Sequence, residues 1–337
     1  MTLKDIAKES GVSVMTVSNV INGKFDRVSQ KTVQKVQAVI DKYQYVPNLS
    51  ARSLTARSTH IIGCILSDQT NNYENIFENP YFSTMLGIIE HDLRENGYYV
   101  MIRAVQTYED IISFLKNWNC DGALFFNPQN EEIIQKLSQD FSMPLVFFDS
   151  NCSDPNILAV DTNDFHGGYL STRYLISHGH KKIAFLAAPT SSVIKNRFDG
   201  YKKALAEAGI PFDPSLIFPI QPIYDNGVKA GKQIASNQRG ITAIVTTADI
   251  CAVGCMEGLR LGGVRIPGEI SIVGYDDLSI CNYTYPKLTS ISQNVPQKAR
   301  LGVELLLKCL GDLPIQKKHL TTSVSLIERQ STISLIP

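Results

Sequence analysis

Residues 2–24 read TLKDIAKESGVSVMTVSNVINGK, and this stretch carries the start and stop signals of two short helices. Thr2, followed three residues later by Asp5, is typical of a helix N-terminus, and Gly11 offers the left-handed position that ends a helix. Ser13 can cap a second helix that ends near Asn22 and Gly23. The buried stripe of that second helix would consist of Val17, Val20 and Ile21. Two helices joined by so short a turn predict a helix-turn-helix motif.

A third helix is predicted to begin near Ser29, because apolar residues follow it at helical spacing and would close a small core. The start and outer face of the second helix then stay free to enter a DNA major groove. The residues expected to contact DNA there are Ser13, Val14, Met15, Thr16, Ser18 and Asn19. Asn19 can pair with adenine, while Val14 and Met15 can contact thymine methyl groups. The alternative is that Val14 and Met15 are core residues of a bundle that does not bind DNA.

The distribution of charge supports a nucleic-acid partner for this segment. The chain of 337 residues has 32 basic and 32 acidic residues and therefore no net charge. Residues 1–60 nevertheless hold nine Lys or Arg against four Asp or Glu, a net charge of +5. A small basic module is thus joined to a larger acidic part, although a lysine-rich solvated surface would give the same count.

Composition excludes several other classes of protein. The length predicts more than one domain, and 44% hydrophobic with 19% charged residues predicts globular folding. No apolar run approaches a membrane span and the N-terminus is charged, so we expect a cytoplasmic protein without membrane contact. Seven cysteines without a CxxC pair indicate reduced thiols. Cys251 with Cys255, and His178 with His180, lack further ligands, and phosphate-loop and nucleophile-elbow motifs are missing. We therefore expect neither metal nor cofactor, and no enzyme.

From residue 61 onward, apolar runs alternate with amphipathic stretches, which predicts βα units and parallel sheets. The predicted helices span residues 83–96, 108–118, 130–139, 165–178, 196–208, 251–261 and 296–309. The order restarts at LAVDTND, residues 158–164, so two doubly wound halves are expected. One would hold residues 61 to about 160 and the other residues 161 to about 290, with the C-terminal segments crossing between them to complete both. A ligand cleft between the lobes follows from this arrangement.

Polar residues that terminate the apolar runs are the candidate ligand contacts, because open α/β sheets bind ligands beyond the carboxyl ends of their strands. They are Asp68, Asn127, Asp149, Asp161, Asp249 and Asp276. Each could instead be a loop carboxylate or a helix cap, and Asp249 in particular could cap the helix near Ile250. Together they predict an acidic cleft suited to a polyhydroxyl ligand.

Several stretches resemble the LacI/GalR family of bacterial repressors, and together they cover essentially the whole chain. They are residues 2–24 above, YVPNLSARSL, VDTNDFHGGYLSTRYLISHGHKKIAFL, NRFDGYKKAL, RIPGEISIVGYDD, PKLTSISQ and LIERQS. The resemblance implies an all-α helix-turn-helix headpiece and an α/β sensor of two lobes like those of periplasmic binding proteins. The implied domains are residues 1–46 for DNA binding, 47–60 for a hinge helix and linker, and 61–337 for effector binding and dimerisation. Lobe one would hold about 61–160 and 292–320, and lobe two about 161–291 and 321–337.

The resemblance also implies roles for individual residues. In the hinge, Leu54 matches the leucine that wedges into the operator minor groove. The other implied hinge contacts to DNA are Asn48, Ala51 and Arg52. The effector contacts that it implies are Tyr81, Phe82, Asp149, Arg197 and Asp276. The full set of predicted ligand contacts adds Asp68 and Asp249 from the strand ends and Tyr224. Two departures from the family pattern concern the ligand: Ala248 stands where sugar-responsive members often have Asn, and Pro222 stands where many have an aromatic residue, which Tyr224 could replace. The stretch QTNNYENIFE is longer than usual.

The function implied is that of a homodimeric repressor that binds a pseudo-palindromic operator in double-stranded DNA. A small molecule between the lobes, a sugar or sugar derivative, would control operator affinity allosterically. A sugar-binding transport protein would share the two lobes but would lack residues 1–60. An enzyme that uses the cleft is the other alternative, and turnover of a bound sugar would distinguish it.

Overall fold

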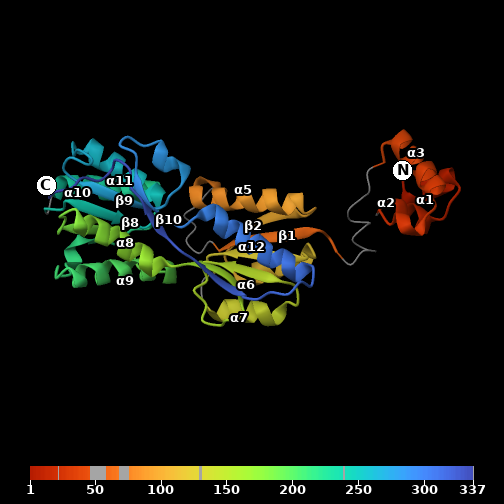
Figure 1. Ribbon diagram of the computed structural model, residues 1–337, viewed down its shortest axis with the longest axis horizontal. Coiled ribbons are helices and arrows are strands. Elements are labelled where there is room, and N and C mark those ends of the chain that lie inside the picture. The colour runs from red at the N-terminus through yellow and green to blue at the C-terminus, as the bar shows by residue number, and fades with distance from the viewer. Residues whose placement is uncertain (22, 46–57, 68–75, 129–130, 238–239, 337) are drawn as a thin grey trace. The chain divides into compact units, whose positions relative to one another are not determined.

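The computed structural model describes residues 1–21, 23–45, 58–67, 76–128, 131–237 and 240–336. The chain divides into two compact units, Met1–Thr59 and His60–Pro337. Figure 1 draws the elements of each unit along the chain. None of the helices in the described part combines the length and apolar character that a membrane span requires.

The first unit is the predicted set of three helices. They are α1 (Leu3–Ser10), α2 (Val14–Ile21) and α3 (Gln30–Tyr43), with the short 3-10 turn η1 (Phe25–Arg27) before α3. Thr2 and Asp5 form a capping box, and Gly11 ends α1 at a φ of 63°. The Ser13 hydroxyl oxygen accepts from the Thr16 amide at 3.1 Å at the start of α2. Ser29 likewise caps α3. These predicted helix signals are confirmed.

Each helix of the first unit contributes to one small core. Ile6 from α1, Val17 from α2 and Val36 from α3 have no exposed surface. Because this mini-core is small, most of its stability must come from the mutual packing of these apolar faces rather than from helix propensity. The α2 face that carries Val17 and Val20 is therefore fixed toward α1 and α3.

The first sheet of the second unit is parallel and lies between two helical layers. Its strand order is β11-β5-β4-β3-β1-β2. The strands are β1 (Ile61–Ser67), β2 (Tyr99–Val105), β3 (Gly122–Phe126), β4 (Leu145–Phe148), β5 (Leu158–Thr162) and β11 (His319–Thr322). Helices α5 (Pro80–Glu95) and α12 (Val295–Leu310) pack on one face, and α6 (Tyr108–Asn117) and α7 (Glu131–Asp140) on the other. The 3-10 turn η2 (Ile76–Glu78) precedes α5.

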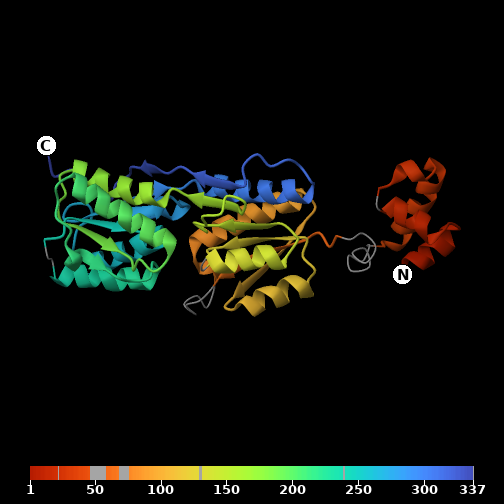
Figure 2. The same cartoon turned by 90° about the horizontal axis from the view of Figure 1, so that it is seen from below.

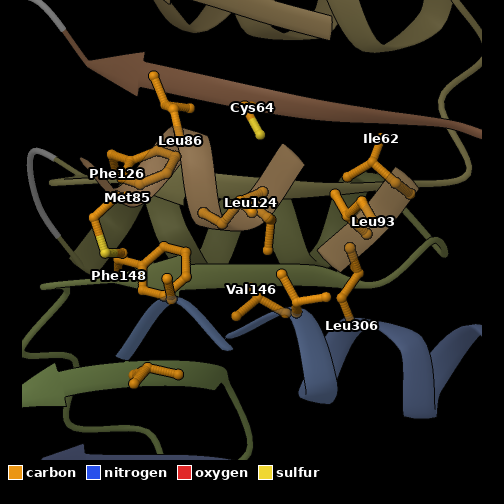
Figure 3. Packing of buried hydrophobic residues seen from close by; sticks show 14 of the residues in the cluster. Ile62, Cys64, Met85, Leu86, Leu93, Leu124, Phe126, Val146, Phe148 and Leu306 are labelled. Carbon is orange, nitrogen blue, oxygen red and sulfur yellow. The ribbon is translucent and has the colours of Figure 1, made fainter. Parts of the chain in front are cut away.

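Alternation along the strands supplies apolar side chains to both layers. Leu124 and Phe126 of β3 face α5 and α12, whereas Phe125 faces α6 and α7. Figure 3 shows the first of these layers, in which Leu306 of α12 and Met85 of α5 meet side chains of the strands. A sheet buried on both faces explains why its strands read as continuous apolar runs.

The second sheet has the order β12-β10-β9-β8-β6-β7 and is parallel except that β12 runs antiparallel to β10. Its strands are β6 (Ile183–Leu186), β7 (Ile217–Phe218), β8 (Ala243–Thr246), β9 (Ser271–Asp276), β10 (Thr289–Ser292) and β12 (Ser325–Ile327). Helices α8 (Asp164–Ser177) and α9 (Ser192–Glu207) cover one face. Helices α10 (Tyr224–Asn237) and α11 (Asp249–Leu261) cover the other. The 3-10 turns are η3 (Pro214–Leu216) and η4 (Ser279–Asn282). The expected two-lobed fold of two doubly wound sheets is confirmed.

The chain passes from one sheet to the other after β5, after β10 and after β11 (Figure 2). The expectation that LAVDTND opens the second half is wrong, because β5 lies between β4 and β11 in the first sheet. A buried parallel strand has apolar side chains on both faces, so its pattern does not specify the sheet that it joins. Helix α10 was not predicted, because its buried stripe contains Gly227, Ala230 and Gly231, which give a weak apolar signal.

Glycines allow the paired helices of the second lobe to pack backbone against backbone. A Cβ atom on Gly254 of α11 would lie 2.1 Å from the carbonyl oxygen of Tyr224, at the start of α10. Gly168 of α8 is equally confined, because its Cβ would lie 1.9 Å from the Arg197 carbonyl oxygen of α9. These pairs must separate to admit any side chain.

We therefore expect Gly254→Ala to lower the free energy of unfolding by about 1–3 kcal/mol, the usual cost of forcing extra volume into a packed interior. Gly87→Ala in α5 is the matched control, because its Cβ would have no described atom within 4 Å. In that exposed helical position alanine should raise the free energy of unfolding by roughly 0.5–1 kcal/mol. Urea unfolding of both variants measures the difference, and equal effects would contradict the close packing.

Candidate nucleic-acid interface and ligand site

The start of α2 presents apolar side chains to solvent. Val14 is 40% exposed and Met15 is 71% exposed, while Val17 of the same helix is fully buried. The alternative that Val14 and Met15 are core residues is therefore wrong. The other predicted contact residues lie beside them: Ser13 is exposed, and Thr16, Ser18 and Asn19 are half-buried. An exposed helix start with apolar and hydroxyl side chains has the chemistry of a surface that contacts base edges.

Some predicted contacts fall on residues that the structure does not describe. They are Asn48, Ala51, Arg52 and Leu54 of the predicted hinge, and Asp68 after β1. Their predicted roles derive from the sequence alone.

A buried lysine organises the polar groups at the carboxyl end of the first sheet. Lys298 of α12 has no exposed surface, and its ammonium group donates to an Asp149 carboxylate oxygen. It also donates to the Thr162 hydroxyl at 2.9 Å and to the Gln293 side-chain oxygen at 3.1 Å. Lysine has three N–H donors, so each of them has a partner here. Tyr81 of α5 donates its hydroxyl to the other Asp149 oxygen at 2.7 Å.

Gln293 extends this network into the second lobe. Its side-chain nitrogen donates to Asp276 Oδ1 at 2.6 Å, at the end of β9. Asp276 has a φ of 114° and Asp149 a φ of 58°, so both acids lie in left-handed backbone at strand ends. Burial raises the pKa of Asp276 well above its ordinary value. A continuous chain of polar contacts thus joins Tyr81 in one lobe to Asp276 in the other.

Arg197 of α9 forms a second buried cluster in the same region of the second lobe. Its Nε donates to Asp164 Oδ1 at 2.8 Å, and its Nη1 donates to the Thr247 carbonyl oxygen at 2.6 Å. The guanidinium group lies 3.5 Å from the centre of the Tyr275 ring, and the Tyr275 hydroxyl donates to the same Asp164 oxygen at 3.2 Å. Although burial opposes its charge, the Asp164 carboxylate keeps the pKa of Arg197 above its ordinary value.

The two lobes also touch directly beside these clusters. Asn151 follows β4, and its side-chain nitrogen donates to the Ser192 hydroxyl at 3.3 Å. The Asn196 side chain of α9 donates to Asn151 Oδ1 at 3.1 Å. A change in the angle between the lobes would therefore alter polar contacts at the strand ends.

Other predicted ligand residues have different surroundings. Phe82 packs edge-on against Phe126 in the first-lobe core, with ring centres 6.1 Å apart. Tyr224 is 40% exposed at the start of α10. Asp161 holds the backbone after β4, because it accepts from the Ser150 amide at 2.7 Å and also contacts His319. Asn127 has a φ of 49° directly after β3.

Asp249 is fully buried and supports the loop after β9. It accepts from the Leu278 amide at 2.8 Å and from the Ser290 hydroxyl at 2.6 Å. Burial raises the pKa of Asp249 to about 6. The alternative that Asp249 caps α11 is wrong, because Ala248 occupies the cap position and Asp249 is the first helical residue.

Sequence reasoning missed Lys298, Gln293, Asp164 and Thr247. Lys298 had a detectable signal, because it lies three residues after Val295 and four before Gly302 on the buried stripe of α12. A lysine on an apolar stripe needs a buried partner. The histidine and cysteine pairs have structural surroundings: His178 ends α8, and Cys251 and Cys255 lie in the second-lobe core. No cluster suited to a metal occurs among the described residues.

Comparison with known proteins identifies relatives of both units. A model described as bacterial regulatory proteins, lacI family, matches residues 2–48, and a model of a periplasmic binding protein-like domain matches residues 172–332. The chain is 32% identical over 340 residues to the HTH-type transcriptional repressor PurR of Vibrio atlanticus (strain LGP32), and the match covers 99% of each protein.

Two solved structures have similar folds. One is the lac repressor dimer bound to operator and the anti-inducer ONPF, with a TM-score of 0.87 and 27% identity over 99% of each chain. The other is a LacI family transcriptional regulator from Enterococcus faecium with bound ribose, with a TM-score of 0.71 and 26% identity. That match covers 82% of this chain and 99% of the other.

The buried lysine leads to a stability prediction. Lys298→Met should lower the free energy of unfolding by about 3–5 kcal/mol, because it leaves the Asp149 carboxylate without its cation. Lys308→Met on the same helix is the control, since Lys308 pairs with Glu304 at 2.6 Å on the surface. Loss of this surface ion pair should lower the free energy of unfolding by less than about 1 kcal/mol. Adding Asp149→Asn to Lys298→Met should recover part of the stability in urea unfolding. Equal losses from the two lysine variants would contradict the role of the buried pair.

Proposed function

The chain belongs to the LacI family of bacterial regulatory proteins, and from this we propose that it reads an operator through α2 and senses a sugar at the carboxyl ends of its two sheets. The protein is a DNA-binding transcriptional repressor whose second unit is a ligand-binding domain. This membership decides against the two alternatives that the sequence left open, an enzyme and a sugar-binding transport protein. Because it acts on bacterial DNA, we place it in the cytoplasm.

The exposed start of α2 is the observation that carries the DNA-binding proposal. Its inner face is buried against α1 and α3, so Val14 and Met15 are held outward on a rigid support. In a major groove these two side chains would contact thymine methyl groups and Asn19 would pair with adenine. The lac repressor structure contains a dimer on its operator. We infer that this chain likewise binds a pseudo-palindromic operator as a homodimer.

The segment of residues 47–60 would connect the headpiece to the sensor as a hinge. In this proposal Leu54 enters the minor groove between the two half-sites, and Asn48, Ala51 and Arg52 contact the DNA around it. Paired hinges from two chains would make the spacing of the headpieces depend on the sensor domains.

The proposed ligand site comprises the polar groups at the strand ends. Arg197 and Asp276 come from the second lobe, and Asp149 and Tyr81 from the first. Carboxylates that accept hydrogen bonds, a guanidinium that donates them and an aromatic ring suit a polyhydroxyl ligand. The Enterococcus faecium neighbour binds ribose, which supports a sugar as the class of effector. Phe82, Tyr224, Asp249 and Asp68 complete the proposed set, with Asp249 acting through the loop that it supports.

Ligand control would work through the contacts between the lobes. A sugar that touches both Asp149 and Asp276 would favour one angle between the lobes over another, and the hinges would transmit that difference. Ligand and operator must then affect each other's binding reciprocally, typically by about 1–3 kcal/mol.

The α2 surface is tested by Met15→Ala in the full chain, with a DNA duplex selected from a random library by the wild-type protein. Binding to this duplex should weaken by about 1–3 kcal/mol for each base contact that is lost. The thermal midpoint should stay unchanged, because Met15 is 71% exposed. Fluorescence anisotropy measures the binding.

Gln34→Ala, an exposed position on α3, is the matched control and should bind the duplex as the wild type does. If Met15→Ala also binds normally and keeps the same base preference, α2 does not read the operator as proposed.

A further inference from the structure

Two buried oxygen atoms, one at the start of α8 and one directly after β8, lack a hydrogen-bond partner among the described residues. They are Asp164 Oδ2 and Thr247 Oγ1. Asp164 is 1% exposed and Thr247 is 2% exposed. Folded proteins seldom leave such atoms unpaired, because a buried polar group without a partner loses its hydration and gains nothing in return. Each of these two atoms can therefore accept a hydrogen bond from a group that enters beside it.

Both residues are held by the same guanidinium group. Arg197 uses Nε for Asp164 Oδ1 and Nη1 for the main-chain carbonyl of Thr247. Asp164 begins α8, and Thr247 directly follows β8. The neighbouring strand β9 ends at Asp276, so Thr247 shares an edge of the second sheet with the acid that Gln293 holds. The side chain of Thr247 takes no part in the Arg197 contact, which leaves its hydroxyl available.

The charges around this edge favour an uncharged ligand. Arg197 is already paired with Asp164, and Lys298 with Asp149. Within the described residues, no ion pair joins Asp276 to a base. Acids thus already neutralise both of these bases, and the unpaired Asp164 atom is an acceptor. A phosphate or carboxylate would face repulsion here, whereas a hydroxyl can donate.

We propose that Asp164 and Thr247 form a hydroxyl-binding subsite beside Arg197, which selects a neutral polyhydroxyl effector over its phosphorylated form. Asp164 Oδ2 accepts from one ligand hydroxyl, and Thr247 Oγ1 pairs with the same hydroxyl or the next one. The inference deepens the proposed function and rests on it. Burial raises the pKa of Asp164, and a hydrogen bond donated by the ligand would favour the carboxylate form.

The test compares two adjacent threonines in the full-length protein. Thr247→Val removes the unpaired hydroxyl but keeps the carbonyl that Arg197 uses. Its matched control is Thr246→Val, because the Thr246 hydroxyl donates to the carbonyl oxygens of Ala248 and Val273, both at 3.2 Å. The thermal midpoint is measured without ligand and with ribose, glucose, galactose, cellobiose, ribose 5-phosphate, glucose 6-phosphate or hypoxanthine, and the affinity of each binder is then determined by calorimetry.

We expect opposite effects from the two variants. Thr247→Val should raise the midpoint of the ligand-free protein, since it removes an unsatisfied hydroxyl, and should weaken the binding of a neutral sugar about tenfold. Thr246→Val should lower the ligand-free midpoint and keep the wild-type sugar affinity. Asp164→Asn provides a second variant: its oxygen can still accept from Arg197, but a donor replaces Oδ2, so sugar binding should fall by at least about tenfold.

Each other outcome counts against the subsite. If a sugar binds the wild type, Thr247→Val and Asp164→Asn with equal affinity, the subsite is absent while the proposed function stands. Tighter binding of a sugar phosphate or of hypoxanthine than of every neutral sugar would overturn the preference for a neutral hydroxyl ligand. A lower ligand-free midpoint for Thr247→Val would mean that water alone satisfies the hydroxyl. If nothing in the panel binds the wild type, the sugar-sensing function fails, and the subsite with it.

Discussion

An ammonium group without solvent contact must find a partner for each of its N–H bonds, and Lys298 meets this requirement with Asp149, Thr162 and Gln293. This constraint places a carboxylate, a hydroxyl and an amide at fixed positions where the first sheet ends. Gln293 then holds Asp276 of the second sheet. Because the chain passes between the lobes next to Gln293, one buried charge determines how polar groups from both lobes face the ligand region.

The different roles of the two units, reading DNA and sensing a ligand, follow from how their cores are built. The headpiece buries only a few apolar side chains, so it can be a compact support for an exposed reading surface on α2. The sensor has helical layers on both faces of each sheet, which leaves the strand ends as the place where polar groups gather. Coupling between these units needs a sensor whose lobes can change the angle between them. Such a movement would alter the contacts of Asn151 with Ser192 and Asn196.

Much of the headpiece could be predicted because its signals are local: Thr2, Gly11 and Ser13 act on residues within one turn of themselves. The strand ends were partly predictable, since Asp149 and Asp276 follow obvious apolar runs. The allocation of β5 to a sheet was not, because a strand that is buried on both faces carries no mark of its neighbours. Sequence reasoning missed Asp164 and Thr247 because each matters through one oxygen atom that has no partner among the described residues. Which of their atoms are paired is decided by the contacts that Arg197 makes with both residues in the folded chain. Such information exists in tertiary contacts alone.

The central claim is that a sugar at the strand ends and an operator at α2 act on one equilibrium. It is tested most directly by measuring operator affinity with and without a saturating sugar, and sugar affinity with and without saturating operator, on the same full-length protein. The account predicts that both ratios are equal and fall between about 5-fold and 150-fold. A sugar that binds tightly while operator affinity stays the same with and without it would contradict the account.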